Sequence, residues 1–329
     1  MSKPKVAFYW CASCGGCEET VVDLAEDILK VVDAVDIALW PVALDFKKKD
    51  VEAWAPGEVT VAFINGSVRL SEQLEWVRLL REKCPIVVAF GACAHLGGIP
   101  GLANATTRER ILENKYFNAP TLDNPDGLQP LTACTVYGCD LELPEFWKDV
   151  KPLDEVIEVD YYLPGCPPPA KTVMSAVTAI LEGTLPPKGA VLSPAKALCE
   201  ACPLNNTKPE TLSISEFKRV ATSTPDPGQC FLAQGYICMG PATRAGCGER
   251  CIRANMPCRG CFGPAPGARD IGGKMLGALG SLGAADTEET SMVLADTLVD
   301  LVGTLYRFNL PASLLKRQYT SGTGVPPVM

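Results

Sequence analysis

Cysteine is the residue type through which this 329-residue chain can do chemistry: it has sixteen cysteines and a single histidine, His95. Five of the cysteines fall within 235–261, a segment of glycine, proline and arginine with too few apolar residues to build a core. Such a segment folds around something other than hydrocarbon, and a metal bound by thiolates is the physical candidate. One histidine cannot supply the mixed ligand sets of most zinc and haem sites, so we expect ligation by cysteine alone, with iron–sulfur chemistry as the leading interpretation.

Four cysteines of the first half each follow a strand-like stretch. They lie in glycine- and proline-rich contexts, SCGGCE, GACAHLGGIPG and LPGCPPP. Ligands of an open parallel sheet collect beyond the carboxyl ends of its strands, so these thiols should converge on one rim. The four are Cys14, Cys17, Cys93 and Cys166. The alternative for any one of them is a buried, inert thiol.

Eight further cysteines of the last third fit two sites of four thiols each. Their short spacings and neighbouring prolines suit cubane iron–sulfur clusters. A zinc ribbon, the alternative, needs two CxxC pairs with a short spacer, and the interval from Cys202 to Cys258 is far wider. The eight are Cys199, Cys202, Cys230, Cys238, Cys247, Cys251, Cys258 and Cys261.

Four cysteines stand outside these groups: Cys11, Cys84, Cys134 and Cys139. We expect them either to be structural or to contact the ligand residues without binding the metal themselves. Cys11 is the exception that stays open, because it lies three residues before Cys14 and could be an alternative ligand.

The elements that must position these thiols alternate between strand and helix over the first half. Period-2 and 3.6-residue apolar patterns predict an open parallel α/β sheet there, interrupted by 103–154. The predicted strands are 6–10, 37–40, 59–64, 86–90 and 156–159, and the predicted helices are 21–32, 71–83 and 170–181. A Pro/Gly linker at 184–194 marks the domain boundary.

The part beyond the linker has no sheet periodicity and one predicted helix near its end. Asp286 with Glu289 is the expected cap of that helix, and its apolar face continues to Leu305. We expect the helix to pack against the cysteine-rich domain, with a partner interface as the alternative.

Charge and hydropathy exclude several classes of partner. The formal net charge is −8, with acidic and basic residues intermixed, which argues against nucleic acid or an acidic membrane surface. No run of eighteen apolar residues is present, so we expect no membrane span. The first residues lead directly into a strand-like stretch without a secretion leader, so we expect a cytoplasmic protein.

Taken together, these loops resemble those of the small subunit of nickel–iron hydrogenases. SCGGCE, GACAHLGGIPG and LPGCPPP resemble its proximal-cluster loops, and CMGPATRAGC and PCRGC its later ones, in the family's order over nearly the whole chain. The resemblance implies a flavodoxin-like domain over 1–188 and an irregular cluster-binding domain over 189–329.

The resemblance also implies three 4Fe–4S clusters and distributes the thiols among them. Cys14, Cys17, Cys93 and Cys166 would bind the proximal cluster, beside the nickel–iron site of a separate large subunit. Cys247, Cys251, Cys258 and Cys261 would bind the medial cluster, and Cys199, Cys202, Cys230 and Cys238 the distal one. Periplasmic relatives have a histidine where this chain has Cys199, and a proline in the medial loop that leaves three irons, whereas Cys251 can supply a fourth thiolate.

Within that family, WCASCGGCEETVVDLAE and WPVALDFK are most similar to the viologen-reducing group. This similarity implies electron transfer from dihydrogen through a small iron–sulfur subunit to heterodisulfide reductase, for flavin-based bifurcation. One alternative is the deazaflavin-reducing type, in which Asp45 would be a candidate proximal ligand. Another is a relay like the related complex I subunit, which has adjacent cysteines in its first loop and lacks the eight-cysteine tail.

Overall fold

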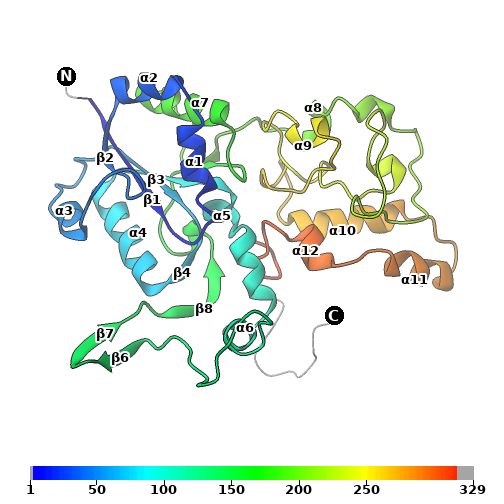
Figure 1. Cartoon of the computed structure of the whole chain (residues 1–329). Helices are drawn as coiled ribbons and strands as arrows, with labels where there is room; N and C mark the ends of the chain where they lie inside the picture. Colours follow the sequence, from blue (N-terminus) through cyan, green and yellow to red (C-terminus); the bar gives the residue numbers. More distant parts are fainter. Residues whose placement is uncertain (1–2, 317–329) are drawn as a thin grey trace.

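A parallel sheet of six strands lies at the centre of the first domain of this computed structural model, which describes residues 3–316 (Figure 1). Along the sheet the strands are β10 (Ala190–Val191), β9 (Tyr161–Leu163), β5 (Ile86–Phe90), β3 (Val61–Asn65), β1 (Lys5–Trp10) and β2 (Asp36–Leu39). Counted within the sheet, this is the order 2-1-3-4-5-6, the doubly wound order of flavodoxin-like folds. The predicted α/β class is confirmed.

Both faces of the sheet are covered by helices, which is why β3 and β5 are almost entirely apolar and buried, with Asn65 at the end of β3 as the one polar residue of the two strands. One face packs against α1 (Gly16–Val22), α2 (Asp27–Ala34) and α7 (Ala170–Leu181). The other packs against α3 (Lys48–Glu52) and α4 (Ser71–Lys83). A short helix, α5 (Gly91–Leu96), begins directly where β5 ends.

Two predicted elements of this domain differ from the structure. The helix expected over 21–32 is two helices, because Ala25 takes a left-handed conformation with φ +51° between α1 and α2. The strand expected at 156–159 begins later, as β9, because the backbone N–H of Asp160 donates to Val87 O and so sets the register with β5. Val156 and Ile157 instead pack partly buried against the core.

The segment that interrupts the α/β pattern forms an arm that projects from the domain (Figure 1). It contains η1 (Ile99–Ala105), α6 (Arg108–Tyr116), a hairpin of β6 (Ala133–Val136) and β7 (Cys139–Glu142), and β8 (Phe146–Lys151) followed by η2 (Leu153–Glu155). β8 ties the arm to the domain by antiparallel pairing with β4 (Val68–Leu70). All residues of the hairpin strands are exposed.

The second domain has its own apolar core and little regular structure. Its elements are α8 (Leu198–Ala201), η3 (Asn205–Thr207), η4 (Leu232–Gln234), α9 (Arg250–Arg253), α10 (Ile271–Leu282), α11 (Glu288–Asp296) and α12 (Leu301–Leu305). The expectation of an irregular, cysteine-rich second domain is confirmed. The boundary near residue 188 stays a prediction, and 317–329 of the expected domain lie outside the described residues.

The single tail helix predicted from the sequence is wrong in two respects. It is divided into α11 and α12 by a turn before Asp300, whose side chain caps α12. The N-cap of α11 is Thr287, which accepts from the Thr290 N–H, and not Asp286. Leu294 and Leu305 do face the domain core, as expected.

The last described residues return to the first domain. Phe308 O accepts a hydrogen bond of 3.1 Å from Gly98 N–H. The ring of Pro311 occupies the space beside Gly97 and Gly101, where a Cβ atom would clash with it. Among the described residues, no helix has the length and apolar character needed to cross a membrane.

We predict that Asp160→Ala lowers the free energy of unfolding by about 2 kcal/mol. The Asp160 carboxylate is fully buried, pairs with Arg81 at 2.6 Å and Lys188 at 2.5 Å, and accepts from Val87 N–H. Burial raises its pKa, but the hydrogen bonds from Lys188, Arg81 and Val87 outweigh burial and lower it overall. The contribution of the Asp160 carboxylate to folding stability is therefore present above pH ~4 and is lost as the pH falls through the lowered pKa.

The free energy of unfolding of the parent and of Asp160→Ala is measured anaerobically in guanidinium, at pH 7 and at acid pH. The exposed Asp33→Ala is the control and should stay within about 0.5 kcal/mol of the parent. An equal loss in the two variants would contradict the assigned role of Asp160.

Candidate metal centres

The four expected proximal thiols lie at the carboxyl edge of the sheet. Cys14 and Cys17 follow β1, with Cys17 in the first turn of α1, and Cys93 lies in the first turn of α5. Cys166 follows β9 and is brought beside α5 by a 2.6 Å hydrogen bond from Ala92 N–H to Gly165 O. The topology therefore brings three separate loops to one rim, as the spacing predicted.

The thiols of this rim are close enough to act on one another electrostatically. Burial raises the pKa of Cys17, and the neighbouring Cys93, Cys166 and Cys14 raise it further. Burial likewise raises the pKa of Cys93 to about 12, with Cys166 and Cys14 adding to the effect, while a hydrogen bond from Ile99 N–H opposes it. Four soft donors thus share one site, Cys14 and Cys166 exposed and Cys17 and Cys93 buried.

Glycine lets the backbone approach these thiols closely. A Cβ atom on Gly91 would clash with the Cys17 Sγ, and one on Gly98 would clash with the Cys93 Sγ. Both glycines also have positive φ, +88° and +57°, which side chains disfavour. Close approach of backbone to sulfur is the arrangement that iron–sulfur sites use to donate N–H groups to cluster sulfides.

The four expected distal thiols line one cavity of the second domain, together with Leu198, Phe231 and Ile252. They are Cys199, Cys202, Cys230 and Cys238. Burial raises the pKa of Cys199, Lys208 lowers it by charge and by a hydrogen bond, and Cys202 and Cys230 raise it. An ideal Cβ atom on Gly240 would lie 3.2 Å from the Cys199 Sγ atom, so this glycine lies directly beside the thiols.

The four expected medial thiols are also neighbours. Burial raises the pKa of Cys261 to about 12, and Cys166, Cys251 and Cys247 raise it further. Burial raises the pKa of Cys251, and the neighbouring Cys247 raises it further. Cys258 belongs to the same set, since its raised pKa reflects burial and then Cys238 and Cys261.

Two contacts join the three groups into a series. Cys261 of the medial set interacts with Cys166 of the proximal set. Cys258 of the medial set donates its backbone N–H to the Cys238 Sγ of the distal set, at 3.3 Å. The medial thiols therefore lie between the other two groups.

The arrangement fits a cluster better than a single ion. No three side chains of His, Cys, Asp or Glu within 3–316 meet around one point where an ion could bind. A cubane makes a different demand, because each of its four irons takes one thiolate from a different direction. Each group has four thiols, glycine beside the sulfurs and partly apolar surroundings, and it therefore fits a 4Fe–4S cluster.

The remaining cysteines lie elsewhere. Cys11 and Cys84 are buried in the core on the α4 face of the sheet, whereas Cys17 lies in the core on the α1 face. Burial raises the pKa of Cys84 to about 12. Cys134 and Cys139 are exposed on the hairpin arm, and Asp45 is exposed in the loop after β2.

Two buried polar side chains lie at these sites without having been given a place there from the sequence, where Glu18 was not singled out and His95 was used only to exclude mixed ligand sets. Glu18, next to Cys17, accepts hydrogen bonds from Trp40 Nε1 and Asn65 Nδ2, and its burial raises its pKa against these bonds. His95 lies under Tyr162, with ring centroids 4.6 Å apart, and burial and Arg244 lower its pKa to about 4. The sequence signal for both is an ionisable residue inside a cysteine-containing loop, at a position that falls on the buried side of α1 or α5.

Curated relatives match the chain over nearly its full length. One is the iron-sulfur subunit of the F420-non-reducing hydrogenase of Archaeoglobus profundus, 41% identical over 317 residues, 95% of this chain and 98% of the relative. Another is the corresponding subunit of the F420-non-reducing hydrogenase of Methanothermobacter thermautotrophicus, 36% identical over 316 residues, 95% and 96% of the two chains. The chain belongs to this family of hydrogenase subunits.

A family model and a solved structure also match the chain. The family model described as NADH ubiquinone oxidoreductase, 20 Kd subunit, matches residues 14–180. The fold is that of a chain in the recombinant [NiFeSe] hydrogenase of Desulfovibrio vulgaris Hildenborough, with a TM-score of 0.51 and 18% identity over 80% of this chain and 94% of that one. Membership makes the chain a subunit of an oxidoreductase that acts on hydrogen and implies a partner hydrogenase subunit.

We predict that Gly91→Ala removes about four irons per chain, because its methyl group displaces the Cys17 sulfur. Gly57→Ala is a matched control, since Gly57 has a similar φ of +80° and no atom within 4 Å of the added Cβ. Both variants carry roughly 1 kcal/mol of backbone strain, but only the first disturbs a thiol. Iron analysis of anaerobically purified protein measures the difference, and full iron in Gly91→Ala would contradict the role given to this glycine.

Proposed function

We propose that the chain relays electrons from dihydrogen oxidation, at a large subunit that holds nickel and iron, through three 4Fe–4S clusters. The observation that carries this proposal is the serial arrangement of the thiol groups, linked by Cys261 with Cys166 and by Cys258 with Cys238. Redox sites that lie next to one another in series form a path for electrons, whereas three separate structural sites would not need to be in contact.

A 4Fe–4S cluster supplies one-electron redox chemistry when bound. The residues of this chain supply the ligands and set the surroundings. The ligands proposed are Cys14, Cys17, Cys93 and Cys166 for the proximal cluster, Cys247, Cys251, Cys258 and Cys261 for the medial, and Cys199, Cys202, Cys230 and Cys238 for the distal. Lys208 brings a positive charge to Cys199, and His95 stays neutral at physiological pH because of its low pKa.

The exposure of the thiols indicates where partners bind. Cys14 and Cys166 are exposed at the rim of the sheet, where the large subunit would cover them. Cys199 and Cys202 are half-buried at the other end of the series, where a small iron–sulfur subunit leading to heterodisulfide reductase would take the electrons. The relatives are named for a hydrogenase that does not reduce F420, a deazaflavin, which argues against the deazaflavin-reducing alternative. A cytoplasmic setting is part of the same proposal.

Metal content tests the number of clusters. Three sets of four thiols should hold about twelve irons and about twelve acid-labile sulfides per chain. Anaerobic purification followed by iron, sulfide and zinc analysis gives the answer. About four irons, or zinc in stoichiometric amount, would rule out the three-cluster relay.

Replacement of Cys251 tests the medial ligand set. Cys251 lies at the start of α9 and interacts with Cys247, so Cys251→Ala should leave the backbone in place and remove one corner ligand. The variant should lose one of about twelve irons and show the electron paramagnetic resonance signal of an oxidised 3Fe–4S centre. The parent and the exposed Cys134→Ala control should lack the signal. The same signal in carefully anaerobic parent protein would remove Cys251 from the ligand set.

A further inference from the structure

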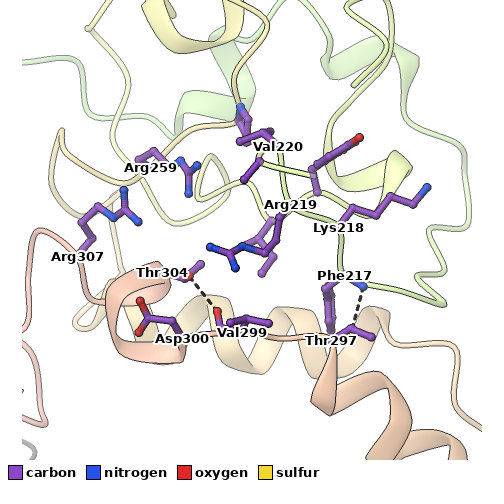
Figure 2. Close-up of a pocket in the computed structure, with 14 residues that line it drawn as sticks. Phe217, Lys218, Arg219, Val220, Arg259, Thr297, Val299, Asp300, Thr304 and Arg307 are labelled. Atoms are coloured by element: carbon purple, nitrogen blue, oxygen red, sulfur yellow. Dashed lines mark hydrogen bonds between the residues drawn. The ribbon is translucent and has the colours of Figure 1, made fainter. Parts of the chain in front are cut away.

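A pocket of the second domain gathers positive charge outside the thiol groups. It is bordered by the segment 217–221, by Tyr236 and Ile237, by the PCRGC loop and by residues of α12 and the turn before it. Figure 2 shows the guanidinium groups of Arg219, Arg259 and Arg307 on one side of the pocket, while the side chain of Lys218 leads away from it.

The three guanidinium groups are near one another without a carboxylate partner. No ion pair to any of the three is found within the described residues, although the pocket also contains Asp300. All three line the same pocket, and their guanidinium groups lie on one side of it (Figure 2). Three like charges are held together in a protein of formal net charge −8, and like charges in contact are unfavourable without a counter-charge.

Local hydrogen bonds hold the group in place. Arg307 Nε donates to Gly303 O at 2.8 Å, which leaves its two terminal nitrogens free of that bond. Arg259 is half-buried and precedes Gly260, whose φ is +91°. Arg219 O accepts from the Thr222 and Ser223 hydroxyls in a turn that Tyr236 Oη supports through Ser223 Oγ.

One carboxylate, that of Asp300, lines the pocket, and within the described residues it forms no ion pair with the three arginines. The carboxylate of Asp300 accepts the Gly303 N–H as the cap of α12. Arg259 is half-buried beside the medial cysteines Cys258 and Cys261. Arg219 and Arg307 have donors suited to an oxyanion.

We propose that this pocket binds a phosphate group, held by Arg219, Arg259 and Arg307. A tetrahedral divalent oxyanion accepts from several guanidinium groups at once, which a single carboxylate does less completely. The source is either free orthophosphate or the phosphate of a small phosphorylated metabolite. Because Arg259 lies between Cys258 and Cys261, a bound anion would add negative charge beside the medial thiols and favour the oxidised form of whatever redox group they hold.

Binding is measured by isothermal titration calorimetry of the anaerobically purified full chain, in phosphate-free buffer, with orthophosphate and with adenosine 5′-monophosphate. We expect one saturable site per chain. Arg219→Gln and Arg307→Gln should each weaken binding at least ~10-fold, the loss of about one charge-assisted hydrogen bond. Arg78→Gln, an exposed arginine on α4, should leave the affinity unchanged. Tighter binding of the nucleotide assigns the phosphorylated metabolite as the source, and equal or weaker binding assigns the free ion.

The same titration on the hydrogenase complex separates this proposal from docking of a partner. Binding that persists in the complex supports the pocket as a small-anion site. Binding to the chain alone that disappears in the complex would assign the arginines to a partner's acidic side chain and overturn the proposal. No saturable binding in either sample, or an equal loss in Arg78→Gln, would overturn it as well, leaving the arginines to balance thiolate charge. These outcomes do not depend on the number of clusters, which the iron analysis tests separately.

Discussion

Convergence of thiols from distant loops is the constraint on which this structure depends. Isolated thiolates repel one another and are costly to bury, and the raised pKa values of Cys17, Cys93 and Cys261 express this cost. A bound metal cluster makes the grouping of thiolates favourable instead of unfavourable, because the cluster needs deprotonated sulfur and its binding contributes folding free energy. The parallel sheet, the glycine turns and the irregular second domain all serve to hold sulfur atoms where that reversal can take place.

The two domains solve the problem by different means. In the first, strand topology does the work: β1, β5 and β9 end at one edge, so loops far apart in sequence meet without further guidance. In the second, only short helices and turns surround the thiols, with Leu198, Phe231 and Ile252 beside the distal set. The first domain has a sheet to specify the site, whereas the second is shaped largely around its sulfur atoms.

Sequence reasoning found what depends on local pattern and spacing. The strand 86–90 and the helices 71–83 and 170–181 were predicted at their observed bounds, because each has a clear apolar period and a clear end. The proximal group was predicted from thiols at strand ends, whereas the division of the other eight thiols came from the family resemblance. The members of each expected group are neighbours in space, and their roles as ligands stay a prediction. The start of β9 was missed, because it is set by pairing with β5 rather than by its own residues.

What escaped prediction is tertiary. The left-handed Ala25 that divides α1 from α2 has no signal in an otherwise helical period. The burial of Glu18 and His95 has no signal in the sequence either, because it depends on how α1 and α5 pack. The arginine pocket draws on residues 219, 259 and 307, which no local pattern connects.

The return of the C-terminal segment to the first domain has a consequence for biogenesis. Gly97, Gly98 and Gly101 belong to the same loop as Cys93, and Phe308 and Pro311 complete its surroundings. On a ribosome, the sheet emerges and can fold long before these last residues are made. The loop that holds Cys93 therefore reaches its final form only after the chain has been made as far as Pro311, so a chain truncated before that residue would present an incomplete rim and be distinguishable from one that extends past it.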